Sequence, residues 1–359
     1  MAEIGLHGVS KRFVGHQALD DLTLTIADGE FFVMLGPTGA GKTTTLRLIA
    51  GLEKPETGSV SIGGEDTSGW SVAQRDVALV FQYYSLYPRY TVKQNLAFPL
   101  KSRVRAFSAD EIEARVARAA KTLRIEHLLD RKTDRLSGGE MQRVSIGRAI
   151  VRDPSAFLMD EPLSNLDAKL REALRSELKD LKNSLGATFV FVTHDQIEAM
   201  SMGDRVGVLN EGKLVQVGTP NQIYNAPVDT FVATFVGSPA MNLLAATVDD
   251  GRLVVPGAFT LPLSDAGRAR LAQGAGPVTV GMRSEDIEIG AGETRAQVHH
   301  VENHGVEQVV TLRAGETLFK ATAPAATRLR IDEEVPFALD QGKMHGFDAT
   351  TGLNLVRAG

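Results

Sequence analysis

One short loop limits what this chain can fold into more than any other feature of its sequence. The apolar run 31–35 leads directly into Gly36-Pro37-Thr38-Gly39-Ala40-Gly41-Lys42-Thr43, and the run 44–50 has the spacing of a helix that stops at Gly51. A strand, a loop of the form GxxxxGK[ST] and a helix in this order form a phosphate-binding loop. The sequence therefore predicts a strand–loop–helix unit of an α/β fold.

The residues of this loop have the chemistry of a nucleotide site. Glycines let backbone N–H groups approach phosphate oxygens, and the N-terminus of a helix favours negative charge. Lys42 is predicted to reach the β- and γ-phosphates, and the Thr43 hydroxyl to be a ligand of Mg²⁺. A glycine-rich turn with a chance lysine is the alternative, but the flanking strand and helix argue against it. The candidate nucleotide-binding residues are Gly36, Pro37, Thr38, Gly39, Ala40, Gly41, Lys42, Thr43 and Thr44.

A second apolar run, 156–159, ends in two carboxylates, Asp160 and Glu161. Asp160 is predicted to hold Mg²⁺ through a water molecule, as the acidic partner of the phosphate loop. Glu161 is predicted to act as a general base that polarises the attacking water. The alternative is a pair of solvated carboxylates that cap the next helix.

Strands and helices alternate through the first two thirds of the chain. Such alternation predicts a mainly parallel sheet with helices on both faces. Apolar positions three and four apart predict an amphipathic helical stretch that opens with the capping-box pattern Ser108…Glu111. The predicted elements are helical residues 108–132, a helix at 137–152 ended by Pro154, a strand at 156–159, a helix at 168–185 and a strand at 188–192.

The pattern of apolar and turn-forming residues changes near residue 240. A linker-like cluster, 237–240, is followed by short apolar runs that alternate with glycine and proline turns. This pattern predicts a small β-rich domain over 238–359, after a first domain over 1–237.

Composition limits the class of protein. The chain has 359 residues, 43% of them apolar and 23% charged, which suits a soluble protein with two domains. A net charge of −5 argues against nucleic acid as a partner, because neutralising phosphates needs a basic surface. There is no cysteine, no apolar run of the roughly 18 to 20 residues that span a bilayer, and no signal-peptide pattern at 1–5. We therefore expect a cytoplasmic protein that reaches a membrane only through a partner.

The segment Leu136-Ser137-Gly138-Gly139-Glu140 lies between the phosphate loop and the acidic strand. Together these motifs resemble the nucleotide-binding subunit of an ATP-binding cassette (ABC) transporter, over residues 1 to about 237. The resemblance implies a P-loop NTPase cassette of α/β class with an inserted helical subdomain at about 88–152, and ATP and Mg²⁺ as cofactors. It also implies a small oligonucleotide-fold-like domain after the cassette.

In this family the signature segment completes the active site of another subunit. The resemblance implies that Ser137, Gly138 and Gly139 bind the γ-phosphate held by the opposite subunit, and a glycine-rich helix N-terminus suits an anion. The alternative is a serine N-cap with glycines for the turn, and Ser137 is compatible with both. The family usually ends this motif with Gln, whereas this chain has Glu140. A carboxylate beside a phosphate is unfavourable unless it points away, so Glu140 is left out of the predicted ATP site.

Four further residues match the family in its order along the chain. Gln82 resembles the glutamine that contacts Mg²⁺ and the attacking water, and His194 resembles the switch histidine at the γ-phosphate. Asp167 belongs to a segment that resembles the one crossing the dimer interface, and Phe13 matches the aromatic that stacks on adenine. Taken alone, a surface glutamine, a structural histidine or a core phenylalanine would be the ordinary interpretation.

The C-terminal domain points to importers. The segment 281–287, Gly-Met-Arg-Ser-Glu-Asp-Ile, resembles an element of the regulatory domain of sugar-importer ATPases, with Ser284 where proline is common. One phosphate loop, no membrane helices and no sustained heptads separate the chain from ribosome-associated, exporter and DNA-repair members. The resemblance is therefore to the maltose and glycerol-phosphate importer group. The sequence leaves open whether this domain binds a regulator or serves packing and dimerisation alone.

The resemblance implies an ATP-hydrolysing subunit that couples hydrolysis to uptake of a carbohydrate or related polar solute. Its implied partners are a second copy of the chain or a close paralogue in an ATP-sandwich dimer, two transmembrane permease subunits and, indirectly, an extracytoplasmic solute-binding protein. The permease would dock near 83–95, and the subunit would lie peripherally on the cytoplasmic face of the inner (plasma) membrane. Importers of polyamines, ions or oxyanions, and soluble ABC ATPases outside transport, are the alternatives.

Overall fold

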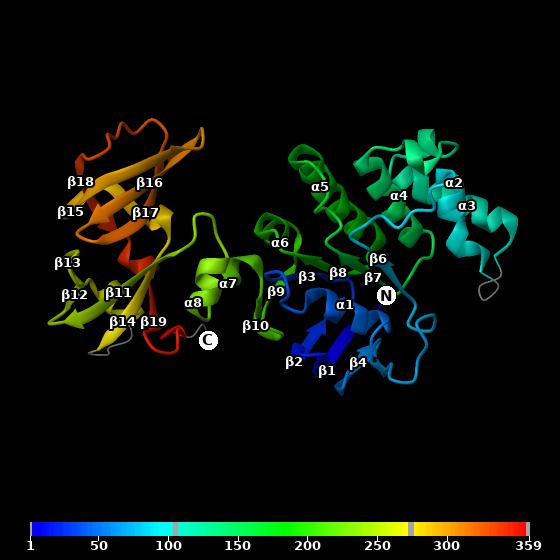
Figure 1. Ribbon diagram of the computed structural model, residues 1–359, viewed down its shortest axis with the longest axis horizontal. Helices are drawn as coiled ribbons and strands as arrows, with labels where there is room; N and C mark the ends of the chain where they lie inside the picture. Colours follow the sequence, from blue (N-terminus) through cyan, green and yellow to red (C-terminus); the bar gives the residue numbers. More distant parts are fainter. Residues whose placement is uncertain (1, 103–106, 272–275, 357–359) are drawn as a thin grey trace. The chain divides into compact units, whose positions relative to one another are not determined.

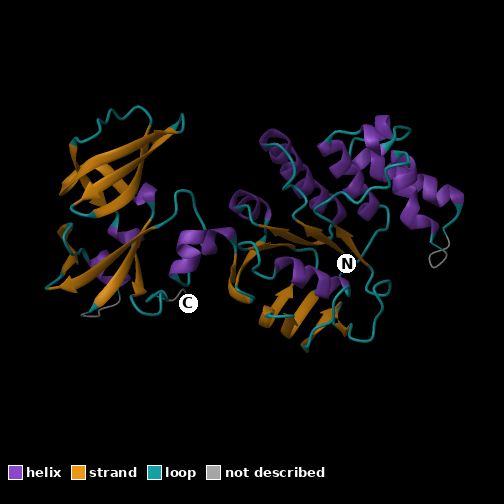
Figure 2. Ribbon diagram, viewed as in Figure 1, coloured by secondary structure: helices purple, strands orange, loops and turns teal. Residues whose placement is uncertain are grey.

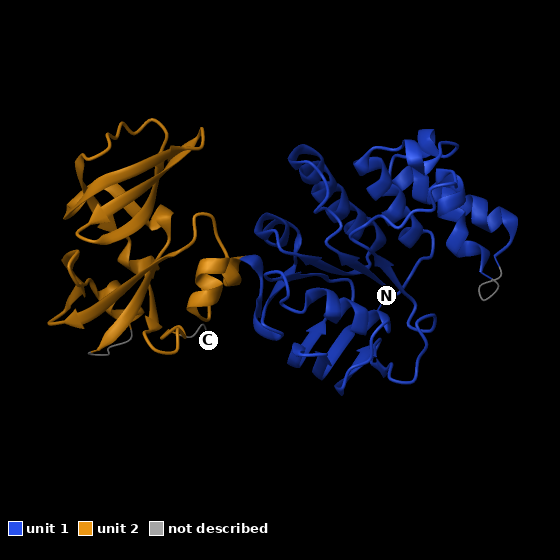
Figure 3. Ribbon diagram, in the orientation of Figure 1, with its two compact units in different colours: residues 1–220 blue, residues 221–359 orange. Residues whose placement is uncertain are grey.

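The computed structural model describes residues 2–102, 107–271 and 276–356. The chain divides into two compact units, Met1–Pro220 and Asn221–Gly359 (Figure 3). The sequence placed the boundary 17 residues later, at 237/238. The difference arises because α7 (Pro220–Asn225) and α8 (Thr230–Phe235) belong mainly with the second unit.

The central sheet of the first unit is parallel except at one edge. Four pairs of neighbouring strands in this sheet run parallel. At one edge, β10 pairs antiparallel with β9. The central strands are buried on both faces, which explains their nearly continuous apolar sequences. The strand order is β10 (Lys213–Gly218), β9 (Arg205–Asn210), β3 (Phe31–Leu35), β8 (Thr188–Thr193), β7 (Ala156–Asp160) and β6 (Val77–Val80).

A smaller antiparallel sheet covers one side of this unit. Helix α1 (Lys42–Ala50) packs between the two sheets, and its apolar side chains join a core built from both (Figures 1 and 2). The smaller sheet has the order β2 (His16–Ile26), β1 (Ile4–Phe13), β4 (Thr57–Ile62) and β5 (Glu65–Asp66).

Helices cover the opposite face of the central sheet (Figure 1). The capping box at Ser108 and Glu111 is confirmed, since both of its hydrogen bonds are present. The predicted helical stretch 108–132 was too long, because Arg124 has a φ of 56° and α-helical geometry ends at Thr122. The elements are α2 (Val92–Ala97), η1 (Phe98–Lys101), α3 (Ala109–Thr122), η2 (Glu126–Leu128), η3 (Thr133–Arg135), α4 (Gly138–Ile150), α5 (Ala168–Leu185) and α6 (Gln196–Met202).

The second unit is built mainly from two antiparallel sheets around one apolar core, as the sequence predicted for this region. No helix in the described parts of either unit has both the length and the apolar character needed to cross a bilayer. One sheet has the order β13 (Phe259–Pro262), β12 (Arg252–Val255), β11 (Asn242–Asp249), β14 (Pro277–Met282) and β19 (His345–Asp348). The other has the order β17 (Thr317–Pro324), β16 (Glu307–Ala314), β15 (Ile287–Asn303) and β18 (Glu334–Leu339), and α9 spans Asp265–Arg270.

Candidate functional site

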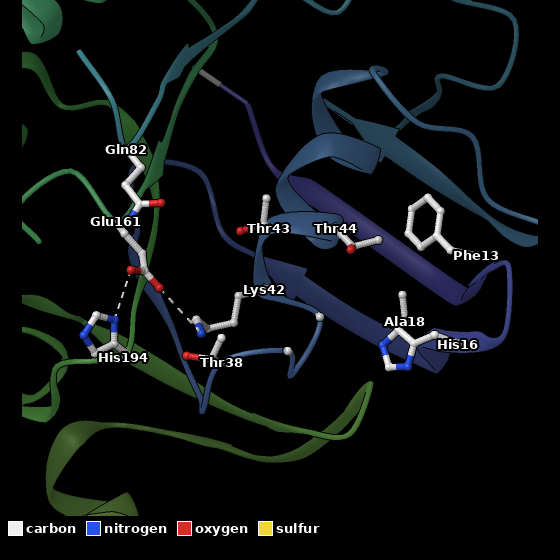
Figure 4. Close-up of a pocket in the computed structure, with 12 residues that line it drawn as sticks. Phe13, His16, Ala18, Thr38, Lys42, Thr43, Thr44, Gln82, Glu161 and His194 are labelled. Atoms are coloured by element: carbon white, nitrogen blue, oxygen red, sulfur yellow. Dashed lines mark hydrogen bonds and ion pairs between the residues drawn. The ribbon is translucent and has the colours of Figure 1, made fainter. Parts of the chain in front are cut away.

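The site lies where three neighbouring parallel strands end. Strands β3, β7 and β8 are adjacent in the sheet, so the segments that follow them meet at one edge. These segments provide the phosphate loop, Glu161 and His194, which surround a pocket of roughly 520 Å³ (Figure 4). The pocket is lined by Phe13, His16, Ala18, Thr38, Gly39, Gly41, Lys42, Thr43, Thr44, Gln82, Glu161 and His194.

The phosphate loop holds the side chain of its lysine in the lining of this pocket, where it is largely buried. Gly41 has a φ of 103°, and a Cβ there would lie 2.5 Å from the carbonyl oxygen of Ala18, so a larger residue does not fit. Lys42 is 5% exposed and donates to the carbonyls of Gly36 and Pro37 at 2.9 and 3.0 Å. Burial lowers its pKa, and nearby carboxylates oppose that shift. A bound phosphate would add further negative charge beside this ammonium and would oppose the lowering of its pKa.

Glu161 links the lysine to the histidine. Its Oε1 lies 3.8 Å from Lys42 Nζ, and its Oε2 lies 3.0 Å from His194 Nδ1 (Figure 4). Its φ is 44°, in the left-handed region that non-glycine residues rarely adopt, and its N–H donates to Val192 of the next strand at 3.0 Å. Strained residues of this kind concentrate at functional sites, and the bond to Val192 holds this one in place.

Thr43 and Asp160 form the second polar pair of the site. The Thr43 hydroxyl donates to Asp160 Oδ1 at 2.9 Å, and burial raises the pKa of Asp160. Both are hard oxygen ligands, and Mg²⁺ is usually held by one or two such protein ligands together with substrate phosphates. No cluster of three or more acidic, histidine or cysteine side chains suited to a metal occurs in the described residues. Through these two oxygens the pair fits a cation that is also held by the phosphates of a nucleotide.

Gln82 is connected to the acidic strand through residues to which the sequence analysis gave no role. The Asn165 side chain donates to the Gln82 carbonyl at 3.0 Å, and Gln82 Nε2 lies 3.4 Å from Ser164 Oγ. Ser164 in turn donates to the carbonyl of Glu161 at 2.9 Å. Asp167, three residues from Ser164, is exposed and accepts from the N–H of Leu170 as the N-cap of α5. Hydrogen bonds through Ser164 and Asn165 therefore link the Gln82 segment to the segment that begins at Glu161.

The other wall of the pocket comes from the β1–β2 hairpin. Phe13 is 39% exposed rather than part of the core, and it pairs in register with His16 across a two-residue turn. His16 and Ala18 line the pocket although the sequence analysis did not select them. The sequence does contain a signal for this pair. Apolar and polar residues alternate on both sides of Val14-Gly15, a pattern that predicts a hairpin in which residues 13 and 16 face each other.

The structure places the signature segment elsewhere on the same unit. Ser137, Gly138 and Gly139 do not line the pocket, and Ser137 is exposed as the N-cap of α4. A Cβ on Gly139 would lie 2.4 Å from Leu170 Cδ2, so the glycine allows α4 and α5 to pack closely. Four other predicted residues do not line the pocket: Gly36 and Pro37, whose carbonyls accept from Lys42, the buried Ala40, and Asp160, which accepts from Thr43.

Comparison with known proteins places this chain in a family. A model described as "ABC transporter" matches residues 19–164, and models of the MalK OB fold domain and the TOBE domain match 237–287 and 280–347. The sn-glycerol-3-phosphate import ATP-binding protein of Rhizobium meliloti is 49% identical over 97% of this chain and 99% of its own length. The chain belongs to the ATP-binding proteins of ABC transporters. It is therefore an ATP-binding protein and an ATPase, and the predicted fold class is confirmed.

Other members of this ABC family match to a similar extent. The trehalose/maltose import ATP-binding protein of Thermococcus litoralis is 46% identical, covering 98% of this chain and 99% of that protein. The sulfoquinovosyl glycerol transport ATP-binding protein of Agrobacterium fabrum is 44% identical with the same coverage. Among solved structures, a dimeric ATP-binding cassette in a post-hydrolysis state with ADP and Pi has a TM-score of 0.54 and 33% identity. It covers 60% of this ABC ATPase and 98% of its own chain.

Proposed function

We propose that this ABC ATPase drives the import of a carbohydrate or a related polyhydroxylated solute. Three relatives that match nearly the whole chain are named for import or transport of glycerol phosphate, trehalose and maltose, or sulfoquinovosyl glycerol. These solutes share a chain or ring of hydroxyl-bearing carbons. The match extends through the C-terminal unit, which supports an importer rather than a cassette of another branch.

The observation that carries the catalytic proposal is the position of the Glu161 carboxylate between Lys42 and His194. Lys42 binds the β- and γ-phosphates, Glu161 accepts a proton from the attacking water, and His194 orients the γ-phosphate. Gln82 would contact Mg²⁺ and the attacking water and would move with the permease, and Phe13 would stack on the adenine. Thr43 and Asp160 would hold Mg²⁺, Asp160 through a water molecule, and the ion would supply positive charge beside the phosphates.

The described residues that line the pocket do not include the signature segment. Ser137, Gly138 and Gly139 do not line the pocket of their own subunit, and they lie at the N-terminus of a 13-residue helix, where Ser137 is exposed and Gly139 is buried. They would serve a second copy or a close paralogue in a head-to-tail dimer, with one ATP at each interface. A cassette of similar fold has been solved as a dimer with ADP and Pi, which supports this arrangement.

The membrane partners would be two permease subunits. Around the segment that follows Gln82, the side chains of Tyr83, Tyr87, Tyr90 and Phe98 are exposed, and the last three contact one another. An exposed aromatic cluster of this kind suits a docking surface for an apolar helix. The ATPase would then lie peripherally at the cytoplasmic face of the membrane, and an extracytoplasmic protein would deliver the solute.

The test is purification of the complex from its native host. Affinity capture of the tagged chain should recover two multi-span membrane subunits, and proteoliposomes of the complex should take up the solute only with ATP inside. The solute is identified by calorimetry of the neighbouring binding protein against sugars, glycerol phosphate, polyamines, metal ions and oxyanions. Binding only of the last three would replace the carbohydrate proposal, and capture without membrane subunits would favour an ABC ATPase outside transport. Glu161→Gln complexes serve as the control without turnover.

A further inference from the structure

An arginine in the first turn of α5 joins two segments at the edge of the candidate site. Arg171 Nη2 donates to the carbonyl of Leu166 at 3.0 Å, and its Nη1 donates to Asp195 Oδ2 at 3.3 Å. Leu166 lies in the segment that leads into α5, and Asp195 directly follows His194. One guanidinium group therefore bridges the segment before α5 and the loop that carries the histidine.

This loop is held on both sides of His194. The Thr193 hydroxyl donates to Glu198 at 2.6 Å and accepts from the N–H of Asp195 at 2.9 Å. Glu198 is 2% exposed, and its Oε1 lies 3.9 Å from Arg171 Nε, which is buried and has no hydrogen bond in the described residues. These contacts fix the backbone around His194, while its half-exposed ring lines the pocket.

The other end of the bridge lies beside the signature glycines. A Cβ on Gly138 would lie 3.6 Å from Leu166 Cδ2, and a Cβ on Gly139 would lie 2.4 Å from Leu170 Cδ2. The segment that leads into α5 and the first turn of α5 thus pack directly against the start of α4. In the proposed dimer these glycines bind the ATP of the other subunit. The contacts therefore run from residues that would serve the partner's ATP to the histidine that would serve the subunit's own.

The two carboxylate oxygens of Asp195 have separate partners. Oδ1 accepts from the N–H groups of Ile197 and Glu198 at 2.8 and 3.2 Å and so caps α6, whereas Oδ2 accepts from Arg171. Asparagine caps helices as well as aspartate does, but it would carry no charge towards the guanidinium. Asp195→Asn therefore weakens the bridge and keeps the cap.

We propose that Arg171 is a positioning residue that couples closure of the dimer to hydrolysis, by holding the His194 loop against the segment beside the signature glycines. The proposal rests on the proposed shared site and on the proposed role of His194. Arg171 does not line the pocket, so it acts through Asp195 and the loop rather than on the nucleotide. Networks of packed side chains and hydrogen bonds carry coupling of this kind between sites.

The decisive variants are Arg171→Gln and Asp195→Asn, which break the same ion pair from opposite ends. Turnover at saturating ATP should fall about threefold to 30-fold in each. The ATP concentration for half-maximal dimerisation, measured by light scattering in a Glu161→Gln background, should change less than about twofold, because the pocket and the signature segment are intact. In the double variant, turnover should stay within about twofold of the slower single variant, because only one link is lost.

A matched control exists on the same helix. Lys182, about three turns further along α5, forms an ion pair with Asp204 at 2.9 Å, and neither residue lines the pocket. Lys182→Gln should leave turnover within about twofold of the parent, since it removes an ion pair without touching the bridge. Urea unfolding and binding of a fluorescent ATP analogue establish that each variant is folded and binds nucleotide.

Three results would overturn the inference alone. Arg171 does not position the loop if both variants keep full turnover while His194→Ala loses it. Its role is only structural if dimerisation falls in step with turnover, or if Lys182→Gln loses as much turnover. It does not act through Asp195 if the two losses multiply in the double variant.

Failure of the proposed function looks different. A parent that binds ATP and never dimerises would refute the shared site, and a His194→Ala variant with full turnover would refute the role of His194. Either result would remove this inference as well.

Discussion

The imidazole of His194 lies 3.0 Å from the carboxylate of Glu161, although 33 residues separate them in the sequence. The contact exists because β7 and β8 are adjacent and parallel, so their C-terminal ends present successive residues at the same edge. In this arrangement the carboxylate is shared between His194 and Lys42. A γ-phosphate would compete for both side chains and leave Glu161 free to accept a proton from water.

Glu161→Gln should reduce turnover by about 10²-fold to 10⁴-fold, because an amide cannot act as a general base. ATP binding should remain, and an ATP-bound dimer should accumulate. Phosphate release measures the first effect and size-exclusion chromatography the second. Unchanged phosphate release would remove Glu161 from the mechanism.

Ser137→Arg should abolish hydrolysis while monomers still bind ATP. The arginine side chain would occupy the space that a second subunit's phosphate needs, whereas the phosphate loop of the same chain is untouched. Equilibrium binding of a fluorescent ATP analogue and steady-state phosphate release distinguish the two effects. Normal hydrolysis by this variant would show that each subunit completes its own site.

Asp160→Asn should make the nucleotide-free protein more stable and a poorer enzyme. Burial raises the pKa of Asp160, so the folded state binds its proton more tightly than the unfolded state and loses stability as pH rises through the folded pKa. Asparagine keeps an oxygen for the Thr43 hydroxyl without a charge. Urea unfolding at pH 7 should therefore give a larger free energy of unfolding for Asp160→Asn than for the parent. This difference should become smaller towards pH 4.

The same substitution should raise the Mg²⁺ concentration for half-maximal ATPase activity about 10-fold to 100-fold. A magnesium titration at saturating ATP makes this measurement, with Asp265→Asn, an exposed carboxylate of the second unit, as the control. An unchanged magnesium requirement would exclude Asp160 from the cation site.

His345 should make the C-terminal unit sensitive to mild acid. Burial, with the charges of Arg270 and Arg283, lowers the pKa of His345 to about 4 from an ordinary value near 6.5. Between these values the unfolded state takes up a proton that the folded state does not. Stability is therefore complete above about pH 6.5 and falls by roughly 3 kcal/mol as pH drops towards 4.

His345→Gln should remove this contribution to the pH dependence. Urea unfolding followed by circular dichroism, at pH values from 4.5 to 7.5, compares the two proteins. Parallel profiles for the two proteins would refute the assignment to His345.

Much of the first unit could be predicted because its signals are local. The helix at 168–185 was predicted with the boundaries that α5 has, since Asp167 caps one end and Gly186, at a φ of 61°, ends the other. The prediction at 108–132 failed where an ordinary-looking arginine, Arg124, adopts a positive φ. The spacing of apolar residues does not predict the positive φ of Arg124, because tertiary packing imposes that angle.

The sequence by itself determined which residues carry the chemistry, since a lysine in a glycine loop and carboxylates after an apolar strand are local patterns. Only the tertiary structure decided which of them meet. It brought His16 to the pocket wall, left Ser137 outside that pocket, and turned Glu140 back onto its own helix. The physical reason is that spacing along the chain encodes local conformation and burial. Distances between remote side chains depend instead on strand order, register and helix packing.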